Sequence, residues 1–399
     1  MKNKNPFSST STVFKDASTF DQGWIPDWRT NPLPCRNDEI NSLTALFKPV
    51  LTQNGKYCVN ALILGRGGVG KTITSKYFGR IFRDAAMEQD MSMLAEYVDC
   101  NEHSTRNAIL RSVLSKLKLS TGRGYSDPEL MKQLVAFLKN NNHYLFLILD
   151  EVHKLEPDDL LSFINASITF GSHNVRMSFL CSSRSQDWLR YGTERLTSRI
   201  QKVYTFKPYN TEECYEILKY RNQLAFYSET FSDDILKMVA EISADEKNMR
   251  TGIEILRQVA LHLDENNNKV ATAEMIRKAG GNTISNYNTD LLNYLSSEHE
   301  YLVLLAVARF FKYHDKTYIT TKEINEQYDI VSEEYGIKPL KFATLKRYIK
   351  RIEDFRLLSK TFALPEGKKR GRESRYSLNS FSAELLEEQL TKMLDNLYP

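Results

Sequence analysis

Residues 65–72 read G-R-G-G-V-G-K-T, a spacing typical of a loop that binds phosphate. Glycines let several backbone N–H groups converge on phosphate oxygens, and the positive end of a following helix adds to the attraction. Lys71 can reach the β- and γ-phosphates of a nucleotide, and the Thr72 hydroxyl can bind Mg²⁺. The expected nucleotide contacts are Gly68, Val69, Gly70, Lys71, Thr72 and Ile73. The alternative is a glycine-rich turn that Lys and Thr follow by chance.

A pair of acids, Asp150 and Glu151, ends the apolar run at 144–149. Carboxylates at this place in a phosphate-binding protein serve two purposes. Asp150 is expected to hold Mg²⁺, directly or through water, and Glu151 to polarise the attacking water. An acidic pair by itself is equally typical of a helix cap. Together with the upstream loop, the pair predicts a P-loop ATPase that uses ATP and Mg²⁺.

The elements that must position these residues alternate between strand and helix. Apolar runs at 57–64, 144–149 and 177–181 are too short for helices and are typical of buried strands of a parallel sheet. A helix is expected at 73–83, directly after the loop. The pattern therefore predicts an α/β domain in which ligands bind at the carboxyl ends of the strands.

Length and composition limit the remaining possibilities. A chain of 399 residues with a net charge of +4, 41% hydrophobic and 26% charged residues is typical of a globular protein of about two to three domains. No long apolar stretch predicts a membrane span or a secretory signal. The five cysteines are scattered and include no C-x-x-C pair, so neither a zinc site nor a disulfide framework is indicated. We expect a soluble, cytoplasmic protein.

The C-terminal region has the pattern of a winged helix. Helices are expected at 299–313, 321–335 and 341–354, followed by a strand at 357–364, a basic turn at 365–373, a returning strand at 375–378 and a closing helix at 382–396. Residues 338–375 contain thirteen Lys/Arg and four Asp/Glu, which is either a footprint for nucleic acid or a solvated surface. A protein-contact module is the alternative to DNA binding. The residues expected to contact DNA are Lys346, Arg347 and Lys350 in the third helix and Lys368, Lys369, Arg370 and Arg372 in the turn.

Several further motifs occur in a characteristic order. They are Pro34-Cys35-Arg36, Glu96-Tyr97-Val98-Asp99-Cys100, Asp150-Glu151-Val152, Arg195-Leu196-Thr197-Ser198-Arg199-Ile200, Phe206-Lys207-Pro208-Tyr209, and residues 248–257. In this order the chain resembles the AAA+ initiators of the archaeal and eukaryotic origin-recognition and cell-division-control family. The resemblance implies an N-terminal arm (1–30), an AAA+ base domain (31–208), a helical lid (209–283) and a winged-helix domain (284–399). A linker is expected at 280–290.

The resemblance also implies roles for individual residues. Tyr209 and Arg221 would contact the adenine nucleotide, and Arg250 would approach its γ-phosphate. Arg195 or Arg199 would be an arginine finger toward a neighbouring subunit, with an intramolecular ion pair as the alternative. Arg257 is expected to pair with Glu254 or Asp264 instead. The loop 119–126, with Arg123, would enter a minor groove of DNA, or would be an exposed connector.

One departure from the family concerns the end of its fourth strand, where an Asn is usual. Residues 182–185 are Ser-Ser-Arg-Ser, which puts fast hydrolysis in doubt. The predicted function is an ATP-dependent replication initiator that binds double-stranded origin DNA beside other initiator subunits and helps recruit the replicative helicase. The alternatives are a STAND-type signalling ATPase and a helper ATPase of a mobile element.

Overall fold

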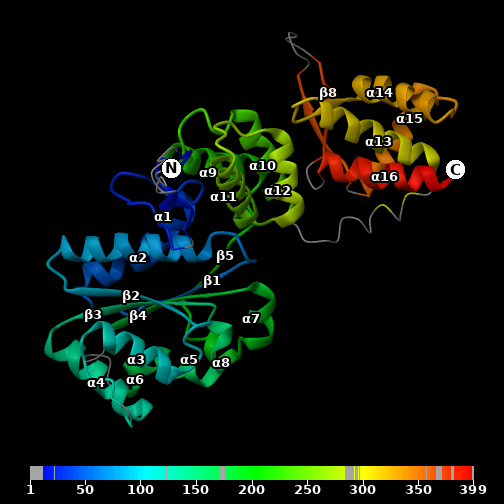
Figure 1. The fold of residues 1–399 in the computed structure, drawn as a ribbon. Coiled ribbons are helices and arrows are strands. Elements are labelled where there is room, and N and C mark those ends of the chain that lie inside the picture. The colour runs from blue at the N-terminus through cyan, green and yellow to red at the C-terminus, as the bar shows by residue number, and fades with distance from the viewer. Residues whose placement is uncertain are drawn as a thin grey trace, which may run out of the picture. The chain divides into compact units, whose positions relative to one another are not determined.

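The computed structural model describes residues 12–21, 23–122, 124–170, 176–283, 292, 295, 297–355, 357–364, 371–378 and 382–397. They form two compact units, Gln22–Tyr209 and Met1–Asp21 with Asn210–Pro399 (Figure 1). None of the helices within the described ranges is long and apolar enough to cross a membrane.

The first unit is built on a five-stranded parallel sheet of order β2-β3-β4-β1-β5, and this confirms the predicted α/β class. The predicted runs at 144–149 and 177–181 lie in β3 and β4, and the run at 57–64 begins three residues before β1. The strands are β1 (Asn60–Leu64), β2 (Met93–Asp99), β3 (Tyr144–Asp150), β4 (Met177–Ser183) and β5 (Lys202–Thr205). Every residue of β3 and β4 is buried, as expected of strands covered on both faces.

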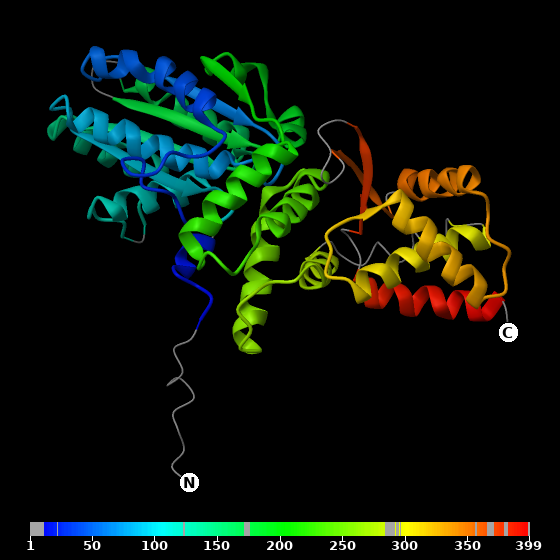
Figure 2. The same cartoon turned by 90° about the horizontal axis from the view of Figure 1, so that it is seen from above.

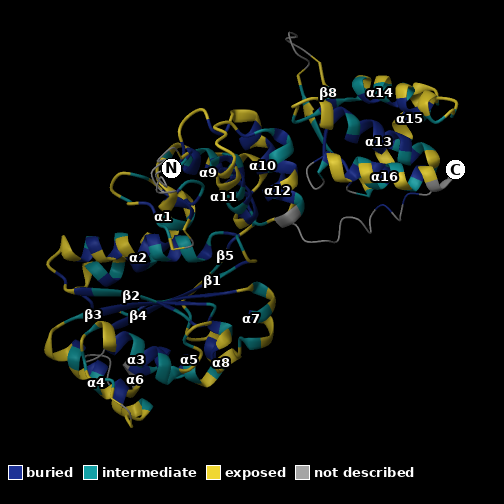
Figure 3. Cartoon of the chain, viewed as in Figure 1, coloured by how far each residue is buried: buried dark blue, intermediate teal, exposed yellow. Residues whose placement is uncertain are grey.

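Helices cover both faces of this sheet (Figure 1). One face packs against α1 (Asn37–Thr52) and α2 (Lys71–Met87), around a cluster of aromatic rings from Phe47, Phe78, Phe82 and Phe146. The other face packs against the remaining helices. These are α3 (Arg106–Lys116), α4 (Asp127–Asn140), α5 (Pro157–Ile164), α6 (Ala166–Thr169), α7 (Ser185–Tyr191) and α8 (Glu194–Thr197), with a short 3₁₀ helix η3 (Val152–Lys154) after β3. Figure 3 shows this layering as buried strands beneath helices with exposed outer faces.

The second unit contains a group of four helices, which lies in the part of the sequence where the lid was predicted. Its helices are α9 (Thr211–Ala225), α10 (Asp233–Asp245), α11 (Met249–Glu265) and α12 (Ala273–Thr283). Because α12 extends to Thr283, the prediction of a linker was wrong for residues 280–283, and residues 284–290 lie outside the described ranges. The N-terminal segment with η2 (Ala17–Phe20) packs on this group: the Val13 N–H donates to Asp264 at 2.8 Å, and the Lys15 N–H donates to the Ala225 carbonyl at 2.7 Å.

The rest of the second unit is a winged helix, as predicted. Three helices precede an antiparallel hairpin, and a closing helix follows it; Figure 2 shows the hairpin standing out beside the helices. The elements are α13 (Glu298–Tyr313), β6 (Ile319–Thr320), α14 (Thr321–Glu334), α15 (Phe342–Asp354), β7 (Ser359–Ala363), β8 (Glu373–Ser377) and α16 (Ala383–Leu397). Leu345, Ile349 and Ile352 of α15 face the domain core, which leaves the opposite face of this helix to solvent.

Candidate nucleotide site and DNA-binding surface

The loop between β1 and α2 has the backbone of a phosphate-binding loop. Gly68 and Gly70 have φ of +76° and +88°, a region that L side chains rarely adopt, and α2 begins directly afterwards at Lys71. The Lys71 side chain is only 5% exposed, and its ammonium donates to the carbonyls of Gly65 and Arg66 at 2.9 and 3.0 Å. The loop therefore holds its cation at the N-terminus of a helix, as anion binding requires.

Asp150 is the centre of a hydrogen-bond network. The Thr72 hydroxyl donates to Asp150 Oδ2 at 2.6 Å, and the Tyr97 hydroxyl donates to the same oxygen at 3.1 Å. The Ser182 hydroxyl donates to the other carboxylate oxygen, Oδ1. Thr72, at the start of α2, and Asp150, at the end of β3, were predicted as the magnesium ligands, and the fold brings them together.

Glu151 lies beside the loop with an unusual backbone. Its φ of +55° is in the left-handed region, and Glu151 Oε1 lies 3.7 Å from Lys71 Nζ. The other oxygen, Oε2, lies 3.5 Å from His153 Nδ1 and 3.7 Å from Arg184 Nε. Burial lowers the pKa of His153, although the neighbouring carboxylates of Glu151 and Asp187 oppose this shift. Glu151 therefore lies between the phosphate-loop lysine on one side and His153 and Arg184 on the other, where a carboxylate can orient a water molecule.

The sheet order explains why Ser182 belongs to the site. Strand β4 lies between β1 and β3, so its carboxyl end separates the phosphate loop from the acidic pair. Ser182 pairs with Ile63 in the register of β1 and β4, and its hydroxyl also accepts from the Glu151 N–H at 3.3 Å. A short hydroxyl in the region where the resemblance predicts an amide is therefore bonded to the acidic pair.

Tyr209 and Arg36 form a stack beside the loop. The Arg36 guanidinium lies 3.9 Å from the centre of the Tyr209 ring and donates to the Val69 carbonyl at 2.8 Å. The Tyr209 hydroxyl lies against Gly70. A role in nucleotide binding was predicted for Tyr209 but not for Arg36, although Arg36 belongs to the Pro34-Cys35-Arg36 motif. The contact of Tyr209 with adenine stays a prediction.

Gly70 and Gly67 provide a matched pair of substitutions in this loop. At Gly70 a Cβ would meet the Tyr209 hydroxyl and would also be strained at φ +88°, whereas a Cβ at Gly67 has no neighbour within 4 Å. Gly70→Ala is expected to destabilise the protein by about 1–2 kcal/mol, and Gly67→Ala by less than about 0.5 kcal/mol. Thermal unfolding without nucleotide measures the difference. Equal melting temperatures for the two variants would contradict this loop geometry.

The remaining residues predicted to sense nucleotide lie in the second unit. Arg221 is buried in α9, and its guanidinium donates to the Thr19 carbonyl. Arg250 is exposed in the first turn of α11, where its N–H donates to the capping Asn248 at 3.1 Å. Arg257 pairs with Glu254 at 2.8 Å, which confirms the structural role predicted for it. The roles of Arg221 and Arg250 toward a nucleotide stay predictions.

The two candidate arginine fingers, Arg195 in α8 and Arg199 just after it, are both exposed. Neither forms an ion pair with a carboxylate in the described part of the chain. The alternative of an intramolecular salt bridge therefore has no support among the described residues. The finger role itself stays a prediction.

The exposed face of α15 carries the cations predicted to contact DNA. Lys346, Arg347 and Lys350 are all exposed, and Lys346 lies over the Phe342 ring at 4.5 Å. In the wing, the Arg372 guanidinium lies 3.5 Å from the centre of the Phe362 ring. Lys368, Lys369 and Arg370, and Arg123 in the loop before α4, lie outside the described residues. The predicted DNA contacts that the structure describes in α15 and the wing are all exposed and are therefore accessible to the phosphate groups of a duplex.

Arg351 on the same helix has a different, structural role. Its guanidinium lies 3.0 Å from Glu300 of α13, whose side chain is fully buried. Arg351→Ala would leave this buried carboxylate without its cation. Because half of the Arg351 side chain is exposed to screening solvent, we expect a loss of about 1–3 kcal/mol of stability. Urea unfolding of Arg351→Ala measures this loss, with Lys350→Ala as the control. Equal unfolding midpoints for the two variants would contradict a stabilising role of the Arg351–Glu300 ion pair.

Sheet order, loop and acidic pair together define an ATPase domain of the AAA+ type, which is followed in this chain by a helical lid and a winged helix. Comparison with family models gives the same three parts. The models are an AAA domain at residues 55–187, a Cdc6 AAA+ ATPase-type lid domain at 215–281 and the C-terminal winged-helix domain of CDC6 at 295–388.

Known proteins resemble this chain along nearly its whole length. ORC1-type DNA replication protein 2 of Sulfurisphaera tokodaii is 26% identical, and the match covers 97% of this chain and 92% of that protein. Among solved structures, Cdc6p of Pyrobaculum aerophilum superimposes with a TM-score of 0.85 at 24% identity, over 96% of this chain and 99% of that one. The Aeropyrum pernix ORC1 protein, solved in complex with DNA, gives 0.61 at 20% identity, over 95% and 97%. The chain belongs to the origin-recognition and cell-division-control family of AAA+ proteins.

Proposed function

We propose that this protein is a DNA replication initiator that binds ATP and origin DNA and helps recruit the replicative helicase. The observation that carries the proposal is the presence, in one chain, of a phosphate loop with its acidic pair and a winged helix with an exposed cationic recognition helix. The lid and winged-helix models are those of Cdc6, and they favour this function over a STAND-type regulator. The partners we propose are double-stranded DNA, other initiator subunits and the helicase.

The described residues fit a magnesium nucleotide. Backbone N–H groups of residues 68–73 and the Lys71 ammonium would hold the phosphates, and the Thr72 hydroxyl and Asp150 carboxylate would hold the metal. When bound, ATP supplies the phosphoryl group and Mg²⁺ neutralises charge on it. Glu151 orients the water that attacks, because its carboxylate is fixed by Lys71, His153 and Arg184. Arg250 from the lid would contact the γ-phosphate, and Arg195 or Arg199 would serve a neighbouring subunit.

Turnover is expected to be slow. Ser182 is shorter than the usual amide and is already bonded to Asp150, so it has less reach toward an attacking water. We expect a kcat well below the enzyme median of roughly 10 s⁻¹, in keeping with a switch that is reset rarely. Phosphate release under saturating ATP, without DNA, measures this rate. Rapid multiple turnover would contradict the proposed role of a switch.

Binding to replication-start DNA tests the proposal as a whole. The purified protein with ATP is mixed with duplexes that tile a replication start of its own cell, and with duplexes of equal length from promoters elsewhere. We expect protection of a few short, related sites within the start. Equal protection of all duplexes, or protection that depends on a small-molecule inducer, would instead favour a transcription switch.

A further inference from the structure

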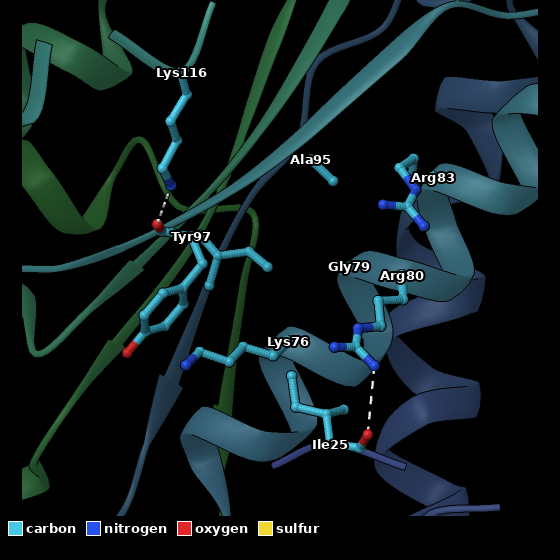
Figure 4. Close-up of a pocket in the computed structure, with 9 residues that line it drawn as sticks. Ile25, Lys76, Gly79, Arg80, Arg83, Ala95, Tyr97 and Lys116 are labelled. Carbon is cyan, nitrogen blue, oxygen red and sulfur yellow. Dashed lines mark hydrogen bonds between the residues drawn. The ribbon is translucent and has the colours of Figure 1, made fainter. Parts of the chain in front are cut away.

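A cavity of about 310 Å³ lies between α2 and the edge strand β2, and no residue of the phosphate loop lines it (Figure 4). Its floor is apolar, and its rim is cationic. The floor is formed by Ile25, Gly79, Ala95, Tyr97 and Ile148, and the rim by Lys76, Arg80, Arg83 and Lys116. Among the described residues that line the cavity, none is acidic. The cavity therefore combines apolar surface with an excess of positive charge.

Two of the four rim cations form no ion pair with a carboxylate in the described part of the chain. Lys76 lies over the Tyr97 ring at 3.7 Å, and Arg80 donates weakly to the Ile25 carbonyl at 3.4 Å (Figure 4). Arg83, by contrast, pairs with Asp84 at 3.0 Å, and Lys116 pairs with Glu96 at 2.9 Å. Burial lowers the pKa of Lys76, although the carboxylates of Asp150, Asp99 and Glu102 oppose this shift. A bound anion would stabilise the charged form of Lys76 and would give Arg80 the partner it lacks.

The edge of β2 adds backbone groups to the cavity. The Tyr144 N–H donates to the Ser92 carbonyl and the Cys100 N–H to the Asp150 carbonyl, so the even-numbered residues of this segment bond to β3. The odd-numbered residues Ala95 and Tyr97 then direct their N–H and C=O groups away from the sheet. No strand in the described ranges pairs on that side, and the Tyr97 carbonyl accepts from the exposed Lys116 side chain at 3.1 Å. Such an edge can accept one more extended chain.

We propose that this cavity docks an extended acidic segment of a partner protein, which adds alongside β2. An extended peptide would bond to Ala95 and Tyr97 through its backbone and would place one apolar side chain on the floor. Its flanking carboxylates would meet Arg80, Lys76 and Lys116. These features favour peptide over nucleic acid, because a phosphodiester chain has no alternating N–H and C=O groups to match a strand edge.

The same cavity is connected to the nucleotide site through one residue. The Tyr97 ring forms part of the cavity floor, while its hydroxyl donates to Asp150, the carboxylate that also accepts from Thr72. A docked acidic side chain would draw Lys76 away from the Tyr97 ring and so change how Tyr97 holds Asp150. Tyr97 is therefore a positioning residue through which a partner would alter nucleotide affinity. This step depends on the proposed nucleotide site, whereas the docking itself does not.

A fluorescent short peptide of alternating glutamate and leucine is the probe for docking, with a lysine–leucine peptide and a single-stranded oligonucleotide as comparisons. Binding to the full chain is measured by anisotropy without nucleotide. Arg80→Glu and Lys116→Glu are each expected to weaken binding of the acidic peptide by about tenfold or more. Lys139→Glu is the matched control, because it makes the same charge change at an exposed residue of α4 on the opposite face of the sheet. Thermal unfolding checks that each variant is folded.

Unchanged peptide binding in Arg80→Glu and Lys116→Glu, or an equal loss in Lys139→Glu, would overturn the docking site. The docking site would also be overturned if the acidic peptide failed to bind the parent protein. It would be overturned as well if binding of the oligonucleotide, but not of the peptide, were weakened by Arg80→Glu and Lys116→Glu. The proposed effect of the docked peptide on the nucleotide site through Tyr97, called the relay below, is tested by ADP affinity. The acidic peptide is expected to change it about fivefold or more in the parent and to leave it unchanged in Tyr97→Phe, which still binds the peptide. A peptide effect on ADP affinity that persists in Tyr97→Phe, or is absent from the parent, would overturn the relay.

Discussion

Lys71→Ala is expected to remove most of the affinity for ATP, and Glu151→Gln is expected to preserve binding while it abolishes hydrolysis. The Lys71 ammonium is almost completely buried in the loop, where it faces the Gly65 and Arg66 carbonyls and Glu151. Each charge-assisted bond to phosphate that is lost costs about 1.5–3 kcal/mol, or roughly 10- to 150-fold in affinity. In Glu151→Gln the amide keeps the size of the side chain but no longer accepts a proton from water.

Calorimetry with ATP measures the first effect, and phosphate release measures the second. Lys132→Ala is a suitable control for Lys71→Ala, because Lys132 is an exposed lysine of α4 with no ion pair to a carboxylate in the described chain. If Lys71→Ala binds ATP as tightly as this control, the assignment of the phosphate loop is wrong. If Glu151→Gln hydrolyses ATP at the parent rate, a different group orients the water.

Substitutions in the winged helix are expected to separate affinity from sequence preference. Replacing Lys368, Lys369, Arg370 and Arg372 of the wing by alanine should weaken binding to specific and random duplexes alike. Each phosphate contact that is lost should flatten the salt dependence by about 0.9 units of log K per log salt. Arg347→Ala or Lys350→Ala in α15 should instead lower the ratio of specific to random binding. The cost of a lost bidentate base contact is roughly 1–3 kcal/mol.

A salt titration of these variants on one origin duplex and one scrambled duplex distinguishes the two effects. Lys392→Ala is the control, because Lys392 is an exposed lysine of α16 in the same domain. Arg351→Ala provides a second comparison, since its expected effect is on stability through Glu300. Binding that is unchanged in both the wing and helix series would remove DNA recognition from this domain and favour a protein-contact module.

Local sequence was sufficient to predict the phosphate loop, since its glycines and the residues that follow define a backbone conformation by themselves. The α/β class and the winged helix were also predicted, because short buried runs and the one-sided apolar pattern of α15 are local signals. The linker was misplaced over residues 280–283 for the opposite reason. Two glycines and an asparagine suggested a linker, but α12 continues through them to Thr283.

The residues that complete the nucleotide site could not be predicted from local sequence. Tyr97 reaches Asp150 because β2 and β3 pair in a register that sets Asp99 opposite Asp150, and such a register is a property of the whole sheet. Arg36 reaches the loop from a segment far away in sequence, and its stack on Tyr209 requires the folded domain. The ion pair of Arg351 could not be predicted either, because its buried partner Glu300 lies on another helix.

Mapping the DNA bound by this protein across its own genome, in parallel with mapping of replication starts, tests the central claim most directly. A replication initiator should occupy a few discrete sites that coincide with replication starts, and Lys350→Ala should lose those sites while it retains weak general binding. Occupancy concentrated at promoters away from any replication start, or no discrete sites at all, would contradict the assignment of this chain as an initiator.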